Sequence, residues 1–320
     1  MNTLLVILYG STIFFLIISL LSLIHKPIWW LKAIDAARFY LLFFLLLLFI
    51  SFLFVEISTV DYILLLLLLS FIVYQFKTIL PFTFLHKPEL RSAGSENAMR
   101  LSFFTANVRM QNTCYDKLIR LIDKYNPDVV LLTEVDQNWL DALEGLESIY
   151  THHILHPQDN TYGMALYAKY PLAKKKVQFL VDEAVPSIHS VMALNENQQI
   201  QLLALHPRPP APWTITENKD LELIYAAGIT NWNRLPSVVL GDLNDVGWSK
   251  TTKQFKIVSQ MLDPRIGRGF FNTYNAYFPL FRYPIDHIFV SRHFRLINME
   301  RLPFFGSDHF PIYLEVQLNF

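Results

Sequence analysis

Residues 305–311 have the sequence Phe-Gly-Ser-Asp-His-Phe-Pro, and an alternating apolar and polar run, residues 312–318, follows directly. Such alternation predicts a β-strand with one buried face. We therefore expect Asp308 and His309 to lie at the start of a strand, where the sheet holds them. Residues 284–290, Pro-Ile-Asp-His-Ile-Phe-Val, repeat this arrangement and place Asp286 at the start of another apolar strand. Either segment alone also fits a turn aspartate beside a surface histidine.

Three long apolar runs, residues 4–24, 39–55 and 60–76, dominate the first 91 residues of this 320-residue chain. Each is close to the roughly 20 residues that a membrane-spanning helix needs, and the only charge in them is Asp61 at the start of the third. A cleavable signal peptide explains the first run poorly, because no basic residue precedes it and two further runs follow. A buried globular core is the other alternative, and the uninterrupted leucines at 64–69 disfavour it. We predict three transmembrane helices and a multi-pass protein of the cell membrane, in contact with the lipid bilayer.

The charges between the runs predict an orientation. Lys26, Lys32 and Arg38 lie between the first and second runs, whereas only Glu56 and Asp61 lie between the second and third. The positive-inside rule places the first loop, and with three spans the C-terminal part, in the cytoplasm. Long trailing domains cross membranes with little regard to charge, so this remains a tendency.

The chain divides into a membrane anchor (residues 1–85), a linker (residues 86–100) and one domain of ordinary size (residues 101–320). The linker is polar and contains Pro, Gly and Ser. Six of the 27 Lys and Arg and four of the 27 Asp and Glu lie within residues 1–91, which leaves the rest with a net charge of about −2. A nucleic-acid-binding surface is normally basic, so a nucleic-acid partner is disfavoured. The single cysteine, Cys114, excludes an internal disulfide.

Polar side chains recur where the apolar segments of the domain begin or end. Residues 101–106 and 128–133 are predicted strands joined by a helix, residues 115–124, and residues 200–205 and 236–240 are further strands. The polar residues at these ends, with those of the two opening segments, are Asn107, Glu134, His206, Asp242, Asn244, Asp286, Asp308 and His309.

Several of these residues also have a structural explanation. Glu134 fits the start of the helix predicted at residues 136–146, His206 fits a structural histidine before Pro207, and the Gly-Asp-Leu-Asn segment at 241–244 fits an Asx turn. The alternative is that Asp242 and Asn244, two apart on extended chain, point the same way.

Taken together, these strand ends predict one concave site. Hard oxygen ligands without thiolates favour Mg²⁺ or Mn²⁺ over zinc. A histidine held by a carboxylate can take a proton from water. The sequence contains no Gly-x-Ser-x-Gly nucleophile motif, no Gly-rich phosphate loop and no dinucleotide fingerprint. The residues therefore predict metal-assisted attack of water on phosphorus.

Five motifs in this order resemble the endonuclease/exonuclease/phosphatase superfamily: Asn107, Leu-Leu-Thr-Glu at 131–134, Gly-Asp-Leu-Asn at 241–244, Ile-Asp-His-Ile-Phe at 285–289 and Ser-Asp-His at 307–309. The resemblance implies an α/β fold, a four-layer sandwich of two packed mixed β-sheets with outer helices, here preceded by three transmembrane helices. The chain more narrowly resembles the membrane-anchored bacterial branch, which includes the teicoplanin-resistance type membrane phosphatases. That branch implies an extracytoplasmic domain, opposite to the charge pattern, so the side of the membrane stays open.

The resemblance also implies a metal site and its ligands. Glu134 would be the principal ligand of Mg²⁺ or Mn²⁺, with Asn107 as its neighbour. Asp308 would be a further ligand or a carboxylate that orients one.

The catalytic roles follow from the same resemblance. His309 would activate water or contact the phosphate, oriented by Asp286. Asp242 would act on the nucleophile or the leaving group, Asn244 would bind the phosphate, and His206 would be a general acid or a further phosphate contact.

The sequence as a whole thus predicts a membrane-anchored, metal-dependent phosphoesterase or phosphatase acting on a lipid-linked or small phosphate or pyrophosphate. Arg208 and Asn112 lie near the expected site and are candidates for binding the substrate phosphate, although Arg208 also fits a solvated side chain. The alternatives are a Mg²⁺-dependent nuclease of the same superfamily and a non-enzymatic membrane interaction module.

Overall fold

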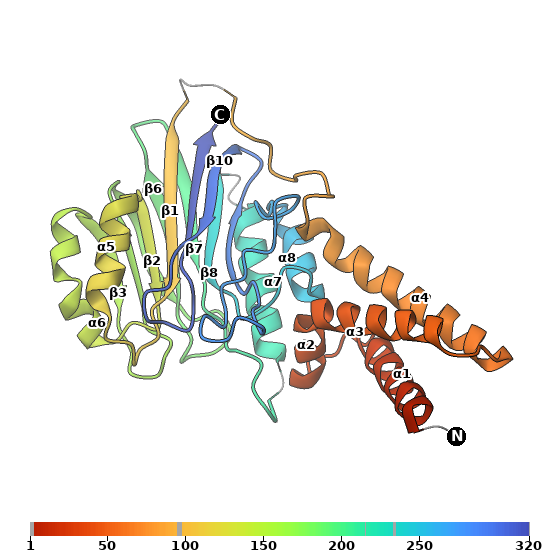
Figure 1. Ribbon diagram of the computed structural model, residues 1–320. Helices are drawn as coiled ribbons and strands as arrows, with labels where there is room; N and C mark the ends of the chain where they lie inside the picture. Colours follow the sequence, from red (N-terminus) through yellow and green to blue (C-terminus); the bar gives the residue numbers. More distant parts are fainter. Residues whose placement is uncertain (1–2, 95–97, 215, 233–234, 320) are drawn as a thin grey trace.

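Figure 1 shows a computed structural model of the chain, which describes residues 3–94, 98–214, 216–232 and 235–319. Two β-sheets pack face to face in the domain, and helices cover both outer faces. The N-terminal helices project from one side of this sandwich.

The first sheet has six strands in the order β10-β11-β1-β2-β4-β3. They are β1 (Arg100–Asn107), β2 (Val129–Thr133), β3 (His152–His156), β4 (Met164–Ala168), β10 (Phe294–Arg301) and β11 (Ile312–Leu318). β1 and β2 are parallel, with α5 (Tyr115–Tyr125) between them, and Asn107 pairs with Thr133. β11 runs antiparallel to β1 and therefore begins where β1 ends. This topology brings the ends of β1 and β2 and the start of β11 to one edge.

The second sheet has five strands in the order β5-β6-β7-β8-β9. They are β5 (Leu172–Gln178), β6 (Ser187–Ala193), β7 (Gln199–Ala204), β8 (Ser237–Asp242) and β9 (Asp286–Val290). β7 and β8 are parallel, joined through α7 (Glu217–Trp232), and β9 is antiparallel to β8 with Asp242 opposite Asp286. The polar ends of these three strands also meet at one edge.

The main core lies between the two sheets. Phe103 and Leu131 from the first sheet pack against residues such as Leu202, Val238 and Ile288 from the second, and all are buried. Helices α5 and α6 (Gln137–Ala142) cover the outer face of the first sheet, and α7 and α8 (Lys250–Ser259) cover that of the second. The four-layer α/β sandwich of two mixed sheets is therefore confirmed.

Two elements of the domain differ from the prediction. The single helix predicted at residues 136–146 is divided into α6 and a short 3₁₀ helix, η3 (Glu144–Ser148). Strand β10 was not predicted, and a bulge between Leu296 and Asn298 explains why. A bulge shifts the alternation of buried and exposed residues by one position, so the period-2 pattern is lost.

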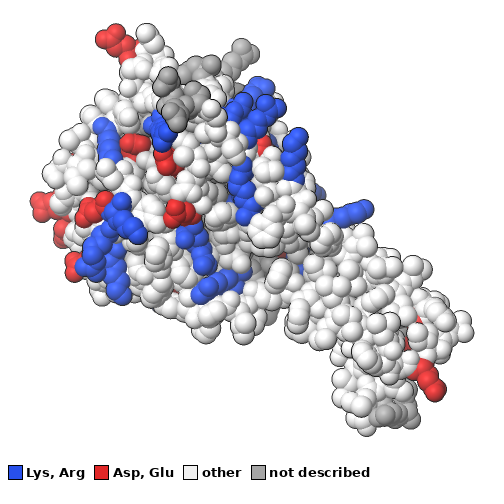
Figure 2. All heavy atoms as spheres, turned by 45° about the horizontal axis from the view of Figure 1, so that its top comes forward, with Lys and Arg blue, Asp and Glu red and all other residues white. Residues whose placement is uncertain are grey.

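The anchor contains four helices, α1 (Thr3–Leu21), α2 (Trp29–Ala36), α3 (Arg38–Ser51) and α4 (Thr59–Ile79), with 3₁₀ extensions η1 (Phe52–Phe54) and η2 (Leu80–Phe82). Two of the described helices, Thr3–Leu21 and Thr59–Phe82, are long and apolar enough to cross a membrane. A third span requires α2 and α3, which bend by 64° at their junction, to count as one. In Figure 2 the surface of this region is almost free of charged residues, as a lipid-facing surface would be.

Helix α2 and the linker are attached to the domain by specific contacts. The ammonium of Lys32 contacts Asp220 of α7 at 2.9 Å and Thr251 of α8 at 2.8 Å, and the indole of Trp248 donates to the Asp35 carbonyl at 2.7 Å. In the linker, the backbone N–H of Ala93 donates to Leu296 of β10. Helix α2 of the anchor and the linker therefore both pack against the domain.

Candidate active site

The polar strand ends of both sheets meet at one place. β1, β2 and β11 bring Asn107, Glu134 and His309 from the first sheet, and β7, β8 and β9 bring His206, Asp242 and Asp286 from the second. A cavity of about 350 Å³ opens beside them. Its lining includes Glu134, His206, Asp242, Asn244, Asp308 and His309. The predicted constellation is thus assembled from six strand ends that are distant in sequence.

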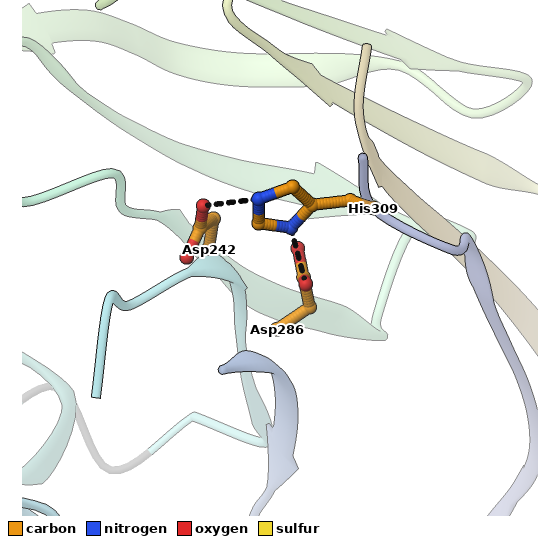
Figure 3. A group of neighbouring side chains, drawn as sticks. All are labelled: Asp242, Asp286 and His309. Carbon is orange, nitrogen blue, oxygen red and sulfur yellow. Dashed lines mark hydrogen bonds and ion pairs between the residues drawn. The ribbon is translucent and has the colours of Figure 1, made fainter. Parts of the chain in front are cut away.

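His309 lies between two carboxylates, as Figure 3 shows. Its Nδ1 is 2.8 Å from Asp286 Oδ2, and its Nε2 is 3.7 Å from Asp242 Oδ2. The backbone N–H of His309 donates to the hydroxyl of Ser307, which itself donates to the Asn107 carbonyl at 2.8 Å. The imidazole is therefore fixed from both sides, and its orientation is tied to the end of β1.

The surroundings of His309 favour its charged form. Burial lowers the pKa of the imidazole, but the charges of Asp286 and Asp242 outweigh burial and raise the pKa to about 10. Burial, reinforced by the charge of Asp286, raises the pKa of Asp242. With these carboxylates alone around it, His309 is an imidazolium suited to hold an anion or donate a proton.

His206 approaches the same oxygen of Asp242 as His309 does, but its pKa is shifted in the opposite direction. Its Nε2 is 3.8 Å from Asp242 Oδ2, and its ring lies at a tilt of 43° to that of Tyr162 with centroids 5.4 Å apart. Its buried Nδ1 has no hydrogen-bond partner among the described residues. Burial lowers the pKa of His206, although Asp242 opposes this. Asp242 therefore lies between a cationic and a neutral imidazole.

Asn107 connects Glu134 to the Asp242 carboxylate. Its amide nitrogen is 2.8 Å from Glu134 Oε1 and 3.1 Å from Asp242 Oδ2, and its oxygen accepts from the backbone N–H of Arg109. Burial raises the pKa of Glu134, partly opposed by the hydrogen bond from Asn107. The backbone of Glu134 has φ 62°, a left-handed conformation that is uncommon outside glycine and clusters at functional sites.

The oxygen-rich donors of this site fit a hard divalent cation. Asp242, Asp286 and His309 offer ligand atoms within 4.8 Å of one another, but Nδ1 of His309 is already hydrogen-bonded to Asp286 Oδ2 at 2.8 Å. Their closeness is explained by the His309 hydrogen bond and ion pair. Glu134 and Asp308 both line the cavity, and within the described residues the Asp308 carboxylate has one hydrogen-bond contact, with Ser307 Oγ at 3.5 Å. Glu134, Asn107 and Asp308 would therefore hold the cation.

The segment around Asn244 is a turn. Its backbone N–H donates to Asp242 Oδ1 at 2.9 Å with φ 49°, and its side-chain amide donates to the Pro207 carbonyl at 3.0 Å. Asp242 and Asn244 are therefore joined by an Asx turn and do not alternate along extended chain. Both nevertheless line the cavity.

Arg208 and Asn112 lie apart from the central group. The guanidinium of Arg208 pairs with Asp182 at 2.5 Å and lies over the ring of Tyr162. The amide of Asn112 donates to the Val108 carbonyl and its oxygen accepts from the Cys114 N–H, so both groups are bound to the local backbone. Neither residue is among those that line the cavity.

Several residues of the site gave no signal in the sequence. The rings of Tyr162 and Tyr274 flank the two histidines, and Lys32, Ala33 and Ala36 of α2 form part of the cavity wall. A helical pattern at residues 29–36 could have predicted α2, because apolar and charged residues alternate there at helical spacing. The position of α2 at the cavity wall depends on tertiary packing, which the sequence pattern does not predict.

The other histidine of the Ile-Asp-His motif has a structural role. His287 is buried, its Nε2 is 2.7 Å from the Asp245 carbonyl, and its Nδ1 accepts from Arg265. Successive strand residues face opposite sides of a sheet, so Asp286 faces His309 and His287 faces away from it.

Comparison with known proteins agrees with this geometry. The model of the Endonuclease/Exonuclease/phosphatase family matches residues 104–309, well over half of the chain. No curated protein matches the sequence in a search of such proteins.

Solved structures share the fold at low sequence identity. An endonuclease/exonuclease/phosphatase from Bacteroides vulgatus is 16% identical, with 69% of this chain and 100% of that chain covered and a TM-score of 0.57. The human Nocturnin catalytic domain with bound sulfate is 17% identical, covering 69% and 95%, with a TM-score of 0.55. D. rerio TDP2 in complex with a single-strand DNA product is 14% identical, covering 68% and 99%, with a TM-score of 0.55.

The family match extends from β1 to His309 and so includes every strand end of the site. Members of this family, nucleases and phosphatases among them, are generally hydrolases of phosphoester bonds. On the family match and the fold together, the chain belongs to the endonuclease/exonuclease/phosphatase family.

Proposed function

We propose that this protein is a membrane-anchored, divalent-metal-dependent phosphoesterase that hydrolyses a phosphate ester or pyrophosphate, either lipid-linked or small. The observation that carries the proposal is the cavity itself. One wall holds Glu134, Asp242 and His309, and another is formed by Lys32 and Ala36 of the anchor helix α2. A phosphate-hydrolysing site built partly from the anchor is suited to a substrate presented at a membrane.

The residues of this chain would divide the chemistry among them. When bound near Glu134, Asn107 and Asp308, a divalent cation would supply charge neutralisation for the phosphate. Asp286 holds Nδ1 of His309, so that Nε2 of the imidazolium is presented to a phosphoryl oxygen or a leaving group.

The remaining groups act on water and on the leaving group. Asp242, whose Oδ2 is within 4 Å of both histidine Nε2 atoms, orients the attacking water and receives its proton. The neutral His206 accepts or passes on that proton, and Asn244 lines the cavity with its amide bonded to the Pro207 carbonyl.

A nuclease is the alternative, since one structural neighbour holds a DNA product. The charge of the domain gives a nuclease little support, because residues 92–320 carry a net charge of about −2 and a DNA-binding surface is normally basic. A non-enzymatic membrane module is disfavoured by the complete set of carboxylate, amide and imidazole groups around the cavity.

The test is phosphate release by the full chain in lipid nanodiscs. The substrates are a polyprenyl pyrophosphate, phosphoinositides, sphingomyelin and plasmid DNA, each with Mg²⁺, with Mn²⁺ and with chelator. We expect metal-dependent hydrolysis of a lipid phosphate and little DNA cleavage. Cleavage of DNA with all lipids inert would contradict the proposal and favour the nuclease.

A further inference from the structure

Two loops form the rim of the catalytic cavity, and both expose large apolar side chains. In residues 207–214, Pro209 and Pro210 line the cavity, and Trp213 is 92% exposed. Residues 275–282 connect Tyr274 to Tyr283, which also line the cavity, and this loop exposes Phe278 (61%), Leu280 (76%) and Phe281 (57%). Exposed apolar residues gathered around one opening indicate an interaction surface.

The first of these loops contacts the anchor. The ring of Trp213 is 6.3 Å from that of Trp29 at the start of α2, and the backbone N–H of Thr216 donates to the Pro27 carbonyl at 2.9 Å. Trp30 is exposed on the same helix. Tryptophan is enriched at the boundary between water and membrane, where its ring is apolar and its N–H is solvated.

The second loop also contacts the anchor, at the first turn of α3. The hydroxyl of Tyr40 accepts from the backbone N–H of Arg282 at 3.0 Å, and its ring is 5.6 Å from that of Phe281. Phe39, half exposed, packs at 5.8 Å against Phe270. Both loops therefore lie against α2 and α3, where the anchor is attached to the domain, and these two helices together form the bent candidate span.

A pair of arginines lies beside the second loop. Arg282 and Arg301 line a groove of about 400 Å³ together with Phe39 and Leu280, and both stack on Phe310, at 4.9 and 4.3 Å from the ring centre. Within the described residues neither guanidinium has a carboxylate within 4.0 Å. Arg282 and Arg301 each donate to a backbone carbonyl, those of Ala276 and Asn272, so their charge is not neutralised by these bonds. Arginines that lack a carboxylate partner and lie beside apolar side chains match the chemistry of an anionic lipid surface.

We propose that this rim, comprising Trp213, residues 278–281, Arg282 and Arg301, is a second membrane-contact surface that enters the interfacial layer of a bilayer containing anionic lipid. The cavity then opens onto the bilayer, and a phosphate-bearing headgroup reaches the site from the membrane surface. The lipid substrate rests on the proposed function, whereas the contact surface does not.

The second loop is bound to the catalytic segment by hydrogen bonds within the protein. The hydroxyl of Tyr277 donates to the Gly306 carbonyl and accepts from Arg109 at 2.9 Å. The backbone N–H of Ala276 donates to the Asp308 carbonyl at 2.6 Å. These bonds involve neither Trp213 nor Leu280, so a charge at those two positions leaves the Ser-Asp-His segment in place.

Fluorescent labelling of the full chain in vesicles tests the contact directly. In a Cys114→Ser background, single cysteines at Leu280→Cys or Trp213→Cys carry an environment-sensitive dye, and vesicles of zwitterionic and anionic phospholipid carry a lipid-bound quencher. Ile149→Cys is the matched control: it is about half exposed and directly follows η3, and the preceding helix α6 lies on the side of the domain away from the anchor in Figure 1. We expect strong quenching at 280 and 213 and little at 149. Equal, weak quenching at all three positions would overturn the proposal.

A second measurement separates this surface from the chemistry. In the double variant Trp213→Glu and Leu280→Glu, hydrolysis of a vesicle-borne lipid phosphate should fall about tenfold, because two charges oppose insertion, while hydrolysis of a water-soluble phosphate ester stays within about twofold. An equal loss on both substrates would contradict the proposal. If no substrate is hydrolysed but the labels are quenched, the proposed function fails and the membrane contact stands.

Discussion

At the scale of single residues, the two histidines of the site differ because their surroundings differ. His309 faces two carboxylates and is held as a cation, whereas His206 is buried beside one carboxylate and has a lowered pKa. Two histidines beside one carboxylate thus take different roles: His309 is a proton donor or phosphate contact, and His206 is a neutral base.

Asp286→Asn tests the carboxylate that orients His309. The amide keeps the size of the side chain but removes the charge that favours the imidazolium and fixes its Nδ1. We expect kcat to fall on the order of a thousandfold with a smaller change in KM. The control is Asp141→Asn on the exposed face of α6, which should retain activity, and equal activity of the two variants would contradict the assignment.

Glu222 of α7 provides a pH-dependent prediction. Burial, with a contribution from Asp182, raises the pKa of its carboxyl to about 8, from 4.5. Below about pH 4.5 the group is neutral whether the chain is folded or unfolded, so it does not lower the free energy of unfolding. Between about pH 4.5 and pH 8 the unfolded chain releases the Glu222 proton and the folded chain keeps it, so the free energy of unfolding falls as the pH rises.

The variant Glu222→Gln removes this penalty. Its melting temperature should match that of the parent near pH 4.5 and exceed it at pH 8. At pH 8 we expect its free energy of unfolding to be larger by about 2–4 kcal/mol. The measurement is the melting temperature of both proteins in the same detergent across this pH range. A constant difference at every pH would show that Glu222 does not ionise as proposed.

At the scale of elements, most strands and helices follow from the sequence, because their apolar spacing matches the observed burial. β1, β2, β7, β8 and α5 form within a residue or two of the predicted bounds. The exceptions have physical causes: the bulge in β10 breaks its alternation, and the predicted helix at 136–146 is divided at Leu143.

A buried ion pair supports the start of β9. Asp263 and Arg265 are both about 1% exposed, and Arg265 also contacts the Asp286 carbonyl and His287. Burial raises the pKa of Asp263, but the charge and hydrogen bonds of Arg265 outweigh it and lower the pKa to about 2.

Asp263→Asn should therefore destabilise the fold by about 3–5 kcal/mol, because it leaves the Arg265 charge buried without a partner. Denaturant unfolding of the full chain measures this change. Asp182→Asn, whose partner Arg208 is at the surface, should cost about 1 kcal/mol or less. Comparable losses in the two variants would contradict the assigned role of the buried pair.

At the scale of the whole molecule, the meeting of the polar strand ends was predictable from the sequence, but the part of the cavity wall formed by α2 was not. The polar residues at strand ends pointed to one edge, since parallel and antiparallel neighbours bring those ends together. The participation of α2 was not predictable, because Lys32 and Ala36 reach the cavity only through the packing of the anchor on α7 and α8. The pairing of Arg208 with Asp182 was likewise not predictable, because the two residues are 26 positions apart in the sequence.

The central claim is that distant strand ends form one cation and phosphate site, with Glu134 as its principal ligand. The most direct test is Mn²⁺ binding to the full chain in detergent, measured by electron paramagnetic resonance, for the parent, Glu134→Gln and the exposed control Glu144→Gln. We predict that the parent and Glu144→Gln bind Mn²⁺ and hydrolyse phosphate, and that Glu134→Gln loses both. Unchanged Mn²⁺ binding and hydrolysis in Glu134→Gln would contradict the account.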